Sequence, residues 1–308
     1  MSGLKKGGFY YLILHTMRNV FLLAILIITC TACEKNIDFN LKNAEPVLAV
    51  DAQIESGLAP VVILTKSFSY FSNITPQLLE SSFVHHAIVF MDNGTVRHQF
   101  KEYTFPLGGG YTAYYYGLDS SAVGTLFSGE FNKKYRLDIS AEGKEYTATT
   151  TIPLLTKVPD SLWFRKAPFN PDTAARILMT KATDPPGLGN YIRYFTKRNR
   201  ENFLPVANSV FDDAIIDGTT YVLQVDPGID RNNLISADQN YFRAGDTVTI
   251  KLCNIDKATF TFWNTWEFAQ QSIGNPFSQP NKVIGNISNG ALGAFYGYAA
   301  WYKTLIAH

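Results

Sequence analysis

Short segments in which apolar residues alternate with polar ones recur along the chain from about residue 47 onward. They are rich in β-branched and aromatic residues and are separated by Gly, Asn, Asp and Pro, which is typical of half-buried strands joined by turns. The pattern predicts strands at residues 47–54, 61–71, 86–91, 96–103, 135–140 and 144–152, and further strands at 176–183, 190–196, 221–225 and 247–252.

Two of the intervening turns have compositions that favour tight hairpins. Asn93-Gly94 and Glu142-Gly143 each join two of the predicted strands. Asn and Gly tolerate the positive φ angles that such turns require. Short strands at this spacing predict an immunoglobulin-like β-sandwich over residues 46–153.

A break in the pattern follows, bracketed by Pro153 and Pro159. Proline cannot donate to a strand ladder and disfavours helix in the residue before it. We therefore interpret residues 154–159 as a semi-rigid linker that few contacts cross. Residues 160–308 then form a second β-rich domain, and the fold class is mainly β.

One helix is predicted inside the second domain, from Asp256 to Ser272. An apolar stripe at intervals of four, three and four residues supports it, formed by Phe262, Trp266, Ala269 and Ile273. Asp256 is suited to cap the helix N-terminus, and the segment Gly274-Asn-Pro276 is suited to end it.

The first 32 residues have the composition of a secretory signal peptide. Lys5, Lys6 and Arg18 precede an apolar run from Val20 to Ile28, and small residues follow up to Ala32. The order basic, apolar, small is that of a cleaved export signal. A membrane-spanning helix needs about 20 predominantly apolar residues, more than this run supplies. Met17 is an alternative start of the chain.

Cys33 is the predicted site of lipid attachment. Ala32 supplies the small residue that lipoprotein signal peptidase needs before its cysteine, whereas Cys30 stands where Leu is usual. Stable anchoring takes two or more acyl chains, which lipoproteins carry on that one cysteine. We expect residues 33–45 to be a lipidated tether to a membrane of the cell envelope. A soluble secreted protein or an uncleaved anchor are the alternatives.

Charge and cysteine content narrow the function classes further. Removing the three basic residues of the signal peptide leaves 24 Lys and Arg against 26 Asp and Glu, a net charge of −2. A nucleic-acid-binding protein would show a basic excess on one face, so nucleic acid is not an expected partner. Of the 3 cysteines, Cys253 alone remains free after processing, so no intramolecular disulfide can form.

Catalytic and metal-binding motifs do not emerge from the sequence. It contains no Gly-x-Ser-x-Gly, P-loop, His-Glu-x-x-His or Cys-x-x-Cys. Adjacent strand residues such as His85 and His86 point to opposite faces, which disfavours shared metal ligation. Cys253 is best interpreted as a buried structural thiol. We therefore assign no catalytic residue, metal or cofactor, and expect a protein without enzymatic activity.

An acidic stretch is the remaining candidate for a metal-binding site. It contains Asp212, Asp213, Asp217, Asp226 and Asp230. Calcium favours clustered carboxylates, but the Asp-x-Asp-x-Asp-Gly spacing of a loop site is missing. Solvated turns account for the Asp-Gly and Asp-Pro-Gly sequences in this stretch.

Tyrosines concentrate in one glycine-flanked segment. Tyr111, Tyr114, Tyr115 and Tyr116 lie between Gly108-Gly-Gly110 and Gly117. Consecutive side chains of a strand alternate between faces, so at least one ring is expected at the surface. Exposed tyrosine is a good contact residue, and these four are our candidates for ligand or partner contact. Covering the sandwich rim or the interdomain joint is the alternative role.

Several motifs, in this order, give the chain a family resemblance. They are Cys33-Glu-Lys-Asn-Ile-Asp38, Thr149-Thr-Thr-Ile-Pro153, Asp184-Pro-Pro-Gly187 with Asn190-Tyr-Ile-Arg193, Gly245-Asp-Thr-Val248, and Gly274-Asn-Pro-Phe277 with Gly285-Asn-Ile-Ser288. The chain thereby resembles the Bacteroidota envelope lipoproteins of domain-of-unknown-function family 4249. The resemblance implies lipidation of Cys33 and association with TonB-dependent outer-membrane uptake systems, and it implies no catalytic residues.

The leading interpretation is therefore a membrane-anchored, non-enzymatic binding or accessory module, with a TonB-dependent barrel as its partner. A structural or assembly protein of the envelope without a small ligand is the second interpretation. A hydrolase of unknown substrate is the third.

Overall fold

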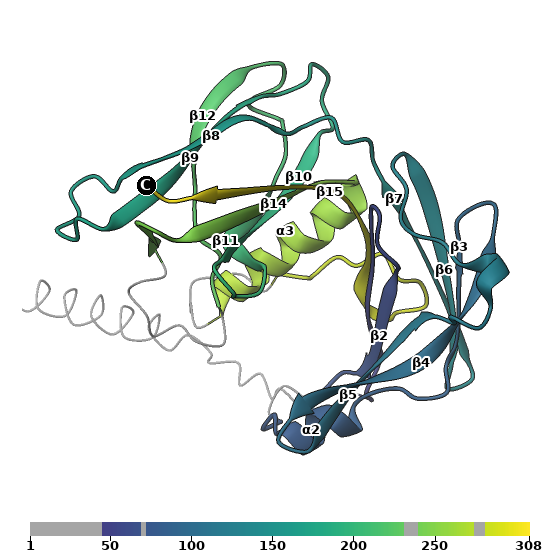
Figure 1. The fold of residues 1–308 in the computed structure, drawn as a ribbon. Helices are drawn as coiled ribbons and strands as arrows, with labels where there is room; N and C mark the ends of the chain where they lie inside the picture. Colours follow the sequence, from purple (N-terminus) through teal and green to yellow (C-terminus); the bar gives the residue numbers. More distant parts are fainter. Residues whose placement is uncertain (1–44, 69–71, 231–239, 274–280) are drawn as a thin grey trace, which may run out of the picture. The chain divides into compact units, whose positions relative to one another are not determined.

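The computed structural model describes residues 45–68, 72–230, 240–273 and 281–308. The signal peptide predicted at 1–32, the tether apart from Glu45, and the helix-ending residues 274–276 lie outside these ranges. Cys33 lies outside them as well. Residues 45–308 form a compact unit, and the description below concerns this unit (Figure 1).

The described residues fold mainly into β-strands, as the alternating pattern predicts. The strands are β1 Leu48–Glu55, β2 Val61–Lys66, β3 Ile88–Asp92, β4 Arg97–Gly108, β5 Tyr111–Leu118, β6 Lys133–Ala141, β7 Lys144–Ile152, β8 Pro159–Lys166, β9 Ala175–Thr183, β10 Tyr191–Arg198, β11 Leu204–Phe211, β12 Thr220–Val225, β13 Phe242–Arg243, β14 Thr247–Ile255 and β15 Leu292–Ile306. The helices are α2 Pro76–Ser81 and α3 Lys257–Ser272, with a 3₁₀ turn at Val123–Thr125.

The mainly β fold class is thus confirmed, and so are the long helix and the predicted strands, with one difference. The strand predicted at 61–71 ends at Lys66, and residues 69–71 lie outside the described ranges. The sequence pattern missed β5, β8, β11, β13, β15 and the short helix α2. The Glu142-Gly143 hairpin turns in two residues, because both adopt positive φ angles and Ala141 pairs with Lys144. The turn at Asn93-Gly94 takes four residues instead of two, since Asp92 pairs with Arg97.

Two long strands tie the large sheet together. Its 11 strands run in the order β11-β10-β14-β15-β1-β2-β5-β4-β3-β6-β7. Residues 97–99 of β4 pair with β3, whereas residues 100–108 pair with β5. β15 likewise pairs with β1, in parallel, through residues 292–298 and with β14 through residues 299–306. Each long strand therefore belongs to two neighbouring segments of the sheet.

The first half of the large sheet folds over to form a sandwich-like core. Buried residues of β1, β2, β3, β6 and β7 pack together with Phe295 and Ala299 of β15. β15 approaches β7 closely at Gly297, where an added Cβ atom would lie 2.9 Å from the Thr151 carbonyl oxygen. Only glycine leaves room for this approach of two backbones.

The pairing of β15 with β1 changes the expected domain organisation. Few contacts were expected to cross residues 154–159, but a strand from beyond them completes the first core. That expectation is wrong, because β15 supplies both backbone partners for β1 and buried side chains to the core. The boundaries at 46–153 and 160–308 stay a prediction from the sequence, and the contribution of β15 to the first core argues against independent folding of residues 46–153.

A second sheet and helix α3 complete the unit. The order β12-β9-β13, with β8 also paired to β9, forms the smaller sheet. α3 packs against β10, β11 and β15 (Figure 1). Its N-cap is Asp256, as predicted, and the Asp256 side chain accepts a hydrogen bond from the Thr259 amide.

The buried face of α3 differs from the predicted stripe in two respects. Phe262 is buried, but Ile273 is 71% exposed and Glu267 is 3% exposed. The helix therefore turns a carboxylate inward where the apolar pattern placed none.

Candidate functional site: a cavity between the two sheets

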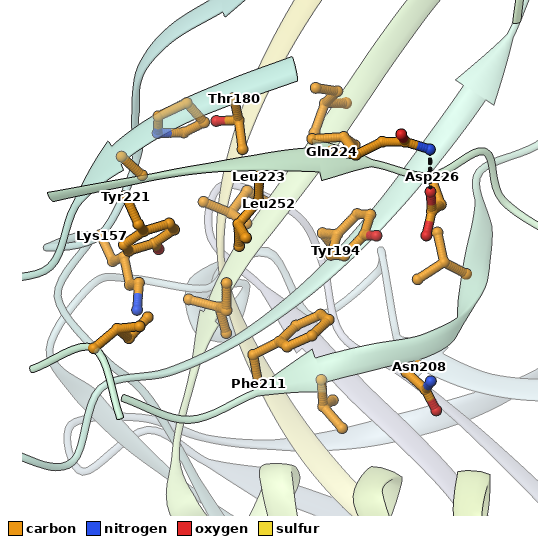
Figure 2. Close-up of a pocket in the computed structure, with 18 of the residues that line it drawn as sticks. Lys157, Thr180, Tyr194, Asn208, Phe211, Tyr221, Leu223, Gln224, Asp226 and Leu252 are labelled. Atoms are coloured by element: carbon orange, nitrogen blue, oxygen red, sulfur yellow. Dashed lines mark hydrogen bonds between the residues drawn. The ribbon is translucent and has the colours of Figure 1, made fainter. Parts of the chain in front are cut away.

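A cavity of about 770 Å³ separates the smaller sheet from one end of the large sheet (Figure 2). β8, β9 and β12 line it on one side, and β10, β11 and β14 line it on the other. The loop after β11 and the first turns of α3 close the remaining walls. This volume falls within the roughly 300–1,000 Å³ typical of small-molecule sites.

Apolar side chains form most of the cavity wall. They include Leu162, Ile192, Val206, Val210, Phe211, Ile216, Leu223, Ile250, Leu252 and Phe260. Leu223 remains 51% exposed and Phe211 remains 39% exposed, although both face this concavity. Large apolar side chains left open in a concave surface mark a binding site more often than a packing defect.

A few polar side chains lie at the two ends of this apolar wall. Figure 2 shows Lys157 and Tyr221 at one end, and Gln224 and Asp226 at the other, with Tyr194 between them. The Gln224 side-chain amide donates to the Asp226 carboxylate at 2.9 Å. A small number of polar groups around an apolar cavity is the arrangement that orients a ligand.

The two tyrosines are held as neutral donors. Burial raises the pKa of Tyr194, and the nearby Asp226 carboxylate raises that pKa further. Burial also raises the pKa of Tyr221, and the Lys157 ammonium partly offsets this effect. At neutral pH both rings carry a hydroxyl group able to donate to an acceptor on a ligand.

Lys157 is itself almost fully enclosed. It is 2% exposed, its ammonium is ion-paired with Asp184, and it lies 5.6 Å from the Tyr221 ring centroid. The Lys157 backbone is held by Asn254, whose side chain accepts from the Lys157 amide and donates to its carbonyl. This position falls in the segment that the sequence suggested as a linker, so sequence reasoning did not consider Lys157.

Behind the cavity wall, strand alternation buries a chain of polar groups. Ile192 and Tyr194 face the cavity, whereas Arg193 between them stacks on Trp263 of α3, with 3.4 Å from its guanidinium carbon to the ring centroid. Arg193 also donates to Ser209 at 3.0 Å and to the Tyr298 hydroxyl at 2.7 Å.

Glu267 completes this buried chain. It accepts hydrogen bonds from both the amide and the hydroxyl of Ser209. Arg193 and Glu267 are each 3% exposed and Ser209 is 0% exposed. Arg193, Ser209 and Glu267 therefore form a buried hydrogen-bonded network, in which one positive and one negative side chain share the serine. This network holds α3 against β10 and β11.

The predicted contact tyrosines lie away from the cavity, on β5. Tyr111, Tyr114 and Tyr115 are half-buried: Tyr111 accepts from Gln77, Tyr114 contacts the His85 ring edge-on, and Tyr115 stacks on Tyr103. A contact role for these three remains a prediction.

Tyr116 differs from its neighbours because it belongs to the first core. It is 2% exposed, its hydroxyl donates to the Val84 carbonyl at 2.7 Å, and it accepts from the Ala87 amide. Burial raises the pKa of Tyr116 to about 12.

The other sequence candidates occupy separate places. His85 is exposed and pairs with Glu102 at 2.5 Å, and His86 is exposed with a positive φ angle, which agrees with a turn position. Cys253 is fully buried, and burial raises the pKa of its thiol to about 12, as a structural thiol requires. The rings of His85 and His86 lie side by side, with centroids 6.3 Å apart, but neither histidine nor Cys253 lines the cavity.

Residues 34–303 match the family described as Domain of unknown function (DUF4249). The chain belongs to this family. The matched range includes every residue that lines the cavity. No match was found among curated proteins. Within the described residues, no helix is long and apolar enough to cross a membrane.

Proposed function

We propose that this protein is a membrane-anchored envelope lipoprotein that binds a small, largely apolar ligand in the cavity between its two sheets. The observation that carries the proposal is the cavity itself, about 770 Å³ with a mainly apolar wall and polar groups at its ends. The proposal treats the protein as a binding module without enzymatic activity.

The arrangement of charges favours a ligand with an apolar body and a polar acceptor. Lys157 and the hydroxyl of Tyr221 lie together at one end, and the hydroxyl of Tyr194 lies farther along the wall. Burial of the apolar body supplies binding free energy of about 25 cal/mol per Å² removed from water. The donors then fix which way round the ligand lies.

A matched pair of substitutions on β12 tests the cavity. Leu223 lines it and is 51% exposed, whereas its neighbour Val222 is 52% exposed and is not part of the lining. We expect Leu223→Lys to abolish binding of an environment-sensitive apolar fluorophore by residues 45–308, because the ammonium enters the apolar space. We expect Val222→Lys to bind the fluorophore as the unchanged protein does.

Two results would count against ligand binding. One is a fluorophore affinity that both substitutions leave unchanged, and the other is an equal loss in both. Native mass spectrometry of the protein purified from its own membranes supplies an independent readout, since a retained small molecule supports the proposal. The structural or assembly role gains if neither fluorophore nor native ligand is held.

Anchoring and partnership are further parts of the proposal. Lipid on Cys33 would hold the cavity near the membrane surface, where a TonB-dependent barrel could receive or supply the ligand. Affinity purification from detergent-solubilised membranes tests this: recovery of such a barrel supports an accessory role in uptake. Recovery of the ligand-binding protein alone removes the uptake link and leaves the binding role.

A further inference from the structure

Three carboxylates meet beside the cavity from two loops that are distant in sequence. Asp184 follows β9, and Asp213 and Asp217 lie in the loop after β11. One oxygen atom from each lies within 4.8 Å of the other two. The sequence pattern indicated only the second loop as acidic, and the fold adds Asp184 to it.

The three carboxylates carry more charge than their surroundings compensate. Lys157 is ion-paired with Asp184, which leaves an excess of two negative charges in the cluster. Asp184 is 1% exposed and Asp213 is 2% exposed, whereas Asp217 is exposed, so water screens the excess charge on Asp213 poorly but reaches Asp217. Buried charge without a compensating partner is costly, which favours a bound cation at this place.

The hydrogen bonds of the two loop residues hold the carboxylates in position without neutralising them. Burial opposes ionisation of Asp213, but the backbone amides of Asn190 and Gly189 donate to it and lower its pKa below the usual range. Asp217 accepts from the Gly187 amide through one oxygen at 2.6 Å.

Asp184 provides a separate observation that points to a ligand. One of its oxygens contacts the Lys157 ammonium, and the other, Oδ2, is buried with no hydrogen-bond partner among the described residues. Buried oxygens without a partner are rare, and each calls for an explanation such as an ion. A cation shared with Asp213 and Asp217 would supply the missing partner.

We propose that Asp184, Asp213 and Asp217 form a binding site for a divalent cation of the calcium type. The site offers oxygen ligands and no His or Cys, a donor set that suits hard cations instead of zinc or copper. Calcium accepts irregular geometry and takes further oxygens from backbone carbonyls and water. The cation would join the loop after β9 to the loop after β11.

The competing explanation is that Lys157 alone serves as the internal cation. One ammonium can balance one carboxylate, and it contacts only Asp184 within the cluster in the described structure. Lys157 and a divalent cation are compatible, because they would use different oxygens of Asp184. The two explanations differ in whether added metal binds, which an experiment can decide.

Terbium is the probe, because it occupies calcium sites and emits when a nearby aromatic ring is excited. Tyr221 lies beside Lys157 and Asp184 and can serve as that ring. We expect the full chain in nonionic detergent to show terbium emission that calcium displaces. Asp217→Asn should weaken terbium and calcium binding at least tenfold, while its amide oxygen can still accept from Gly187.

Asp212→Asn is the matched control, since Asp212 is exposed in the same loop but does not belong to the cluster. We expect it to bind terbium within twofold of the unchanged chain. Asp184→Asn gives a second test by removing the buried oxygen. If that variant does not fold, Asp217→Asn still decides the matter.

Two outcomes would overturn the proposal. The first is no calcium-displaceable terbium emission together with a melting temperature that is the same in calcium and in a chelator. The second is terbium binding that Asp212→Asn weakens as much as Asp217→Asn does, which would indicate diffuse attraction to an acidic surface. Because the readout is metal binding, it is independent of whether the cavity holds an apolar ligand.

Discussion

Replacing Glu267 by Leu should destabilise the fold strongly. Glu267 accepts two hydrogen bonds from Ser209, and through it faces the buried guanidinium of Arg193. Leucine has similar size but cannot accept a hydrogen bond. The substitution therefore leaves the Ser209 amide without its acceptor and Arg193 without a balancing charge, in surroundings that water does not reach.

The expected magnitude follows from these lost interactions. A hydrogen bond to a charged group contributes about 1.5–3 kcal/mol, so the two from Ser209 amount to roughly 3–6 kcal/mol. Burying the leucine side chain returns part of this, at about 1.5–3 kcal/mol. Leaving Arg193 unbalanced adds to the loss, and the total then matches the about 3–5 kcal/mol that removing one partner of a buried ion pair typically costs. We expect a net loss on the order of 3–5 kcal/mol.

Urea unfolding of residues 45–308, followed by circular dichroism, measures this loss. Gln270→Leu is the control, because Gln270 lies exposed on the same helix and should change stability by no more than about 0.5 kcal/mol. The double variant with Arg193→Leu should lose less than the sum of the two single changes, since it removes both charges. A loss below about 1 kcal/mol for Glu267→Leu would refute the idea that this chain of polar groups stabilises α3.

Other predictions concern the anchor, the sheets, the tyrosines and the thiol. Cys33→Ala should abolish fatty-acid labelling and move the protein to the soluble fraction; continued labelling would disprove the lipidation site. Residues 46–153 expressed alone should show no cooperative melt, because β15 is missing; a sharp melt would mean the first core needs no β15. Tyr116→Ala should cost about 3 kcal/mol or more in urea, whereas Tyr114→Ala should weaken partner capture at unchanged stability; equal stability losses would remove the contact role. Cys253 in residues 45–308 should resist a chromogenic thiol reagent at pH 8 until urea is added, because burial blocks access to the thiol and raises its pKa to about 12, which leaves very little thiolate at pH 8; prompt reaction would contradict this.

The alternation of apolar and polar residues predicted the strands that have one face buried in the core and the other exposed to solvent. β6 and β7 alternate between buried and exposed residues along most of their length, and their hairpin turn followed from Glu142-Gly143. Helix α3 was predicted equally well from the sequence, because Asp256 caps its N-terminus as its position in the sequence suggested. In each case a single segment contains the whole signal.

The missed strands lack that signal for physical reasons. Residues 294–299 of β15 are all buried, because the strand is covered on both faces, and a continuous apolar run does not distinguish strand from helix. β8 begins at Pro159, which the pattern assigned to a linker; proline is compatible with the first residue of a strand. The sequence pattern predicts no strand over β5, since its flanking glycines and run of tyrosines show no alternation of apolar and polar residues.

The candidate sites depend on contacts that no local pattern contains. The cavity needs β8, β9 and β12 on one side and β10, β11 and β14 on the other, which only the sheet order brings together. Asp184 reaches Asp213 because the loops after β9 and β11 are adjacent in space. Glu267 could not be identified, since a buried carboxylate in a helix looks like any solvated one until its partners are known.

The parallel pairing of β1 with β15 has a consequence for the order of events during synthesis. Ala49 pairs with Leu292, so one of the first strands made must wait for almost the last before its backbone groups are satisfied. Closing so long a loop is entropically unfavourable, and folds dominated by such distant pairings form slowly. The first core should therefore remain incomplete until β15 has been made, however early its other strands are synthesised.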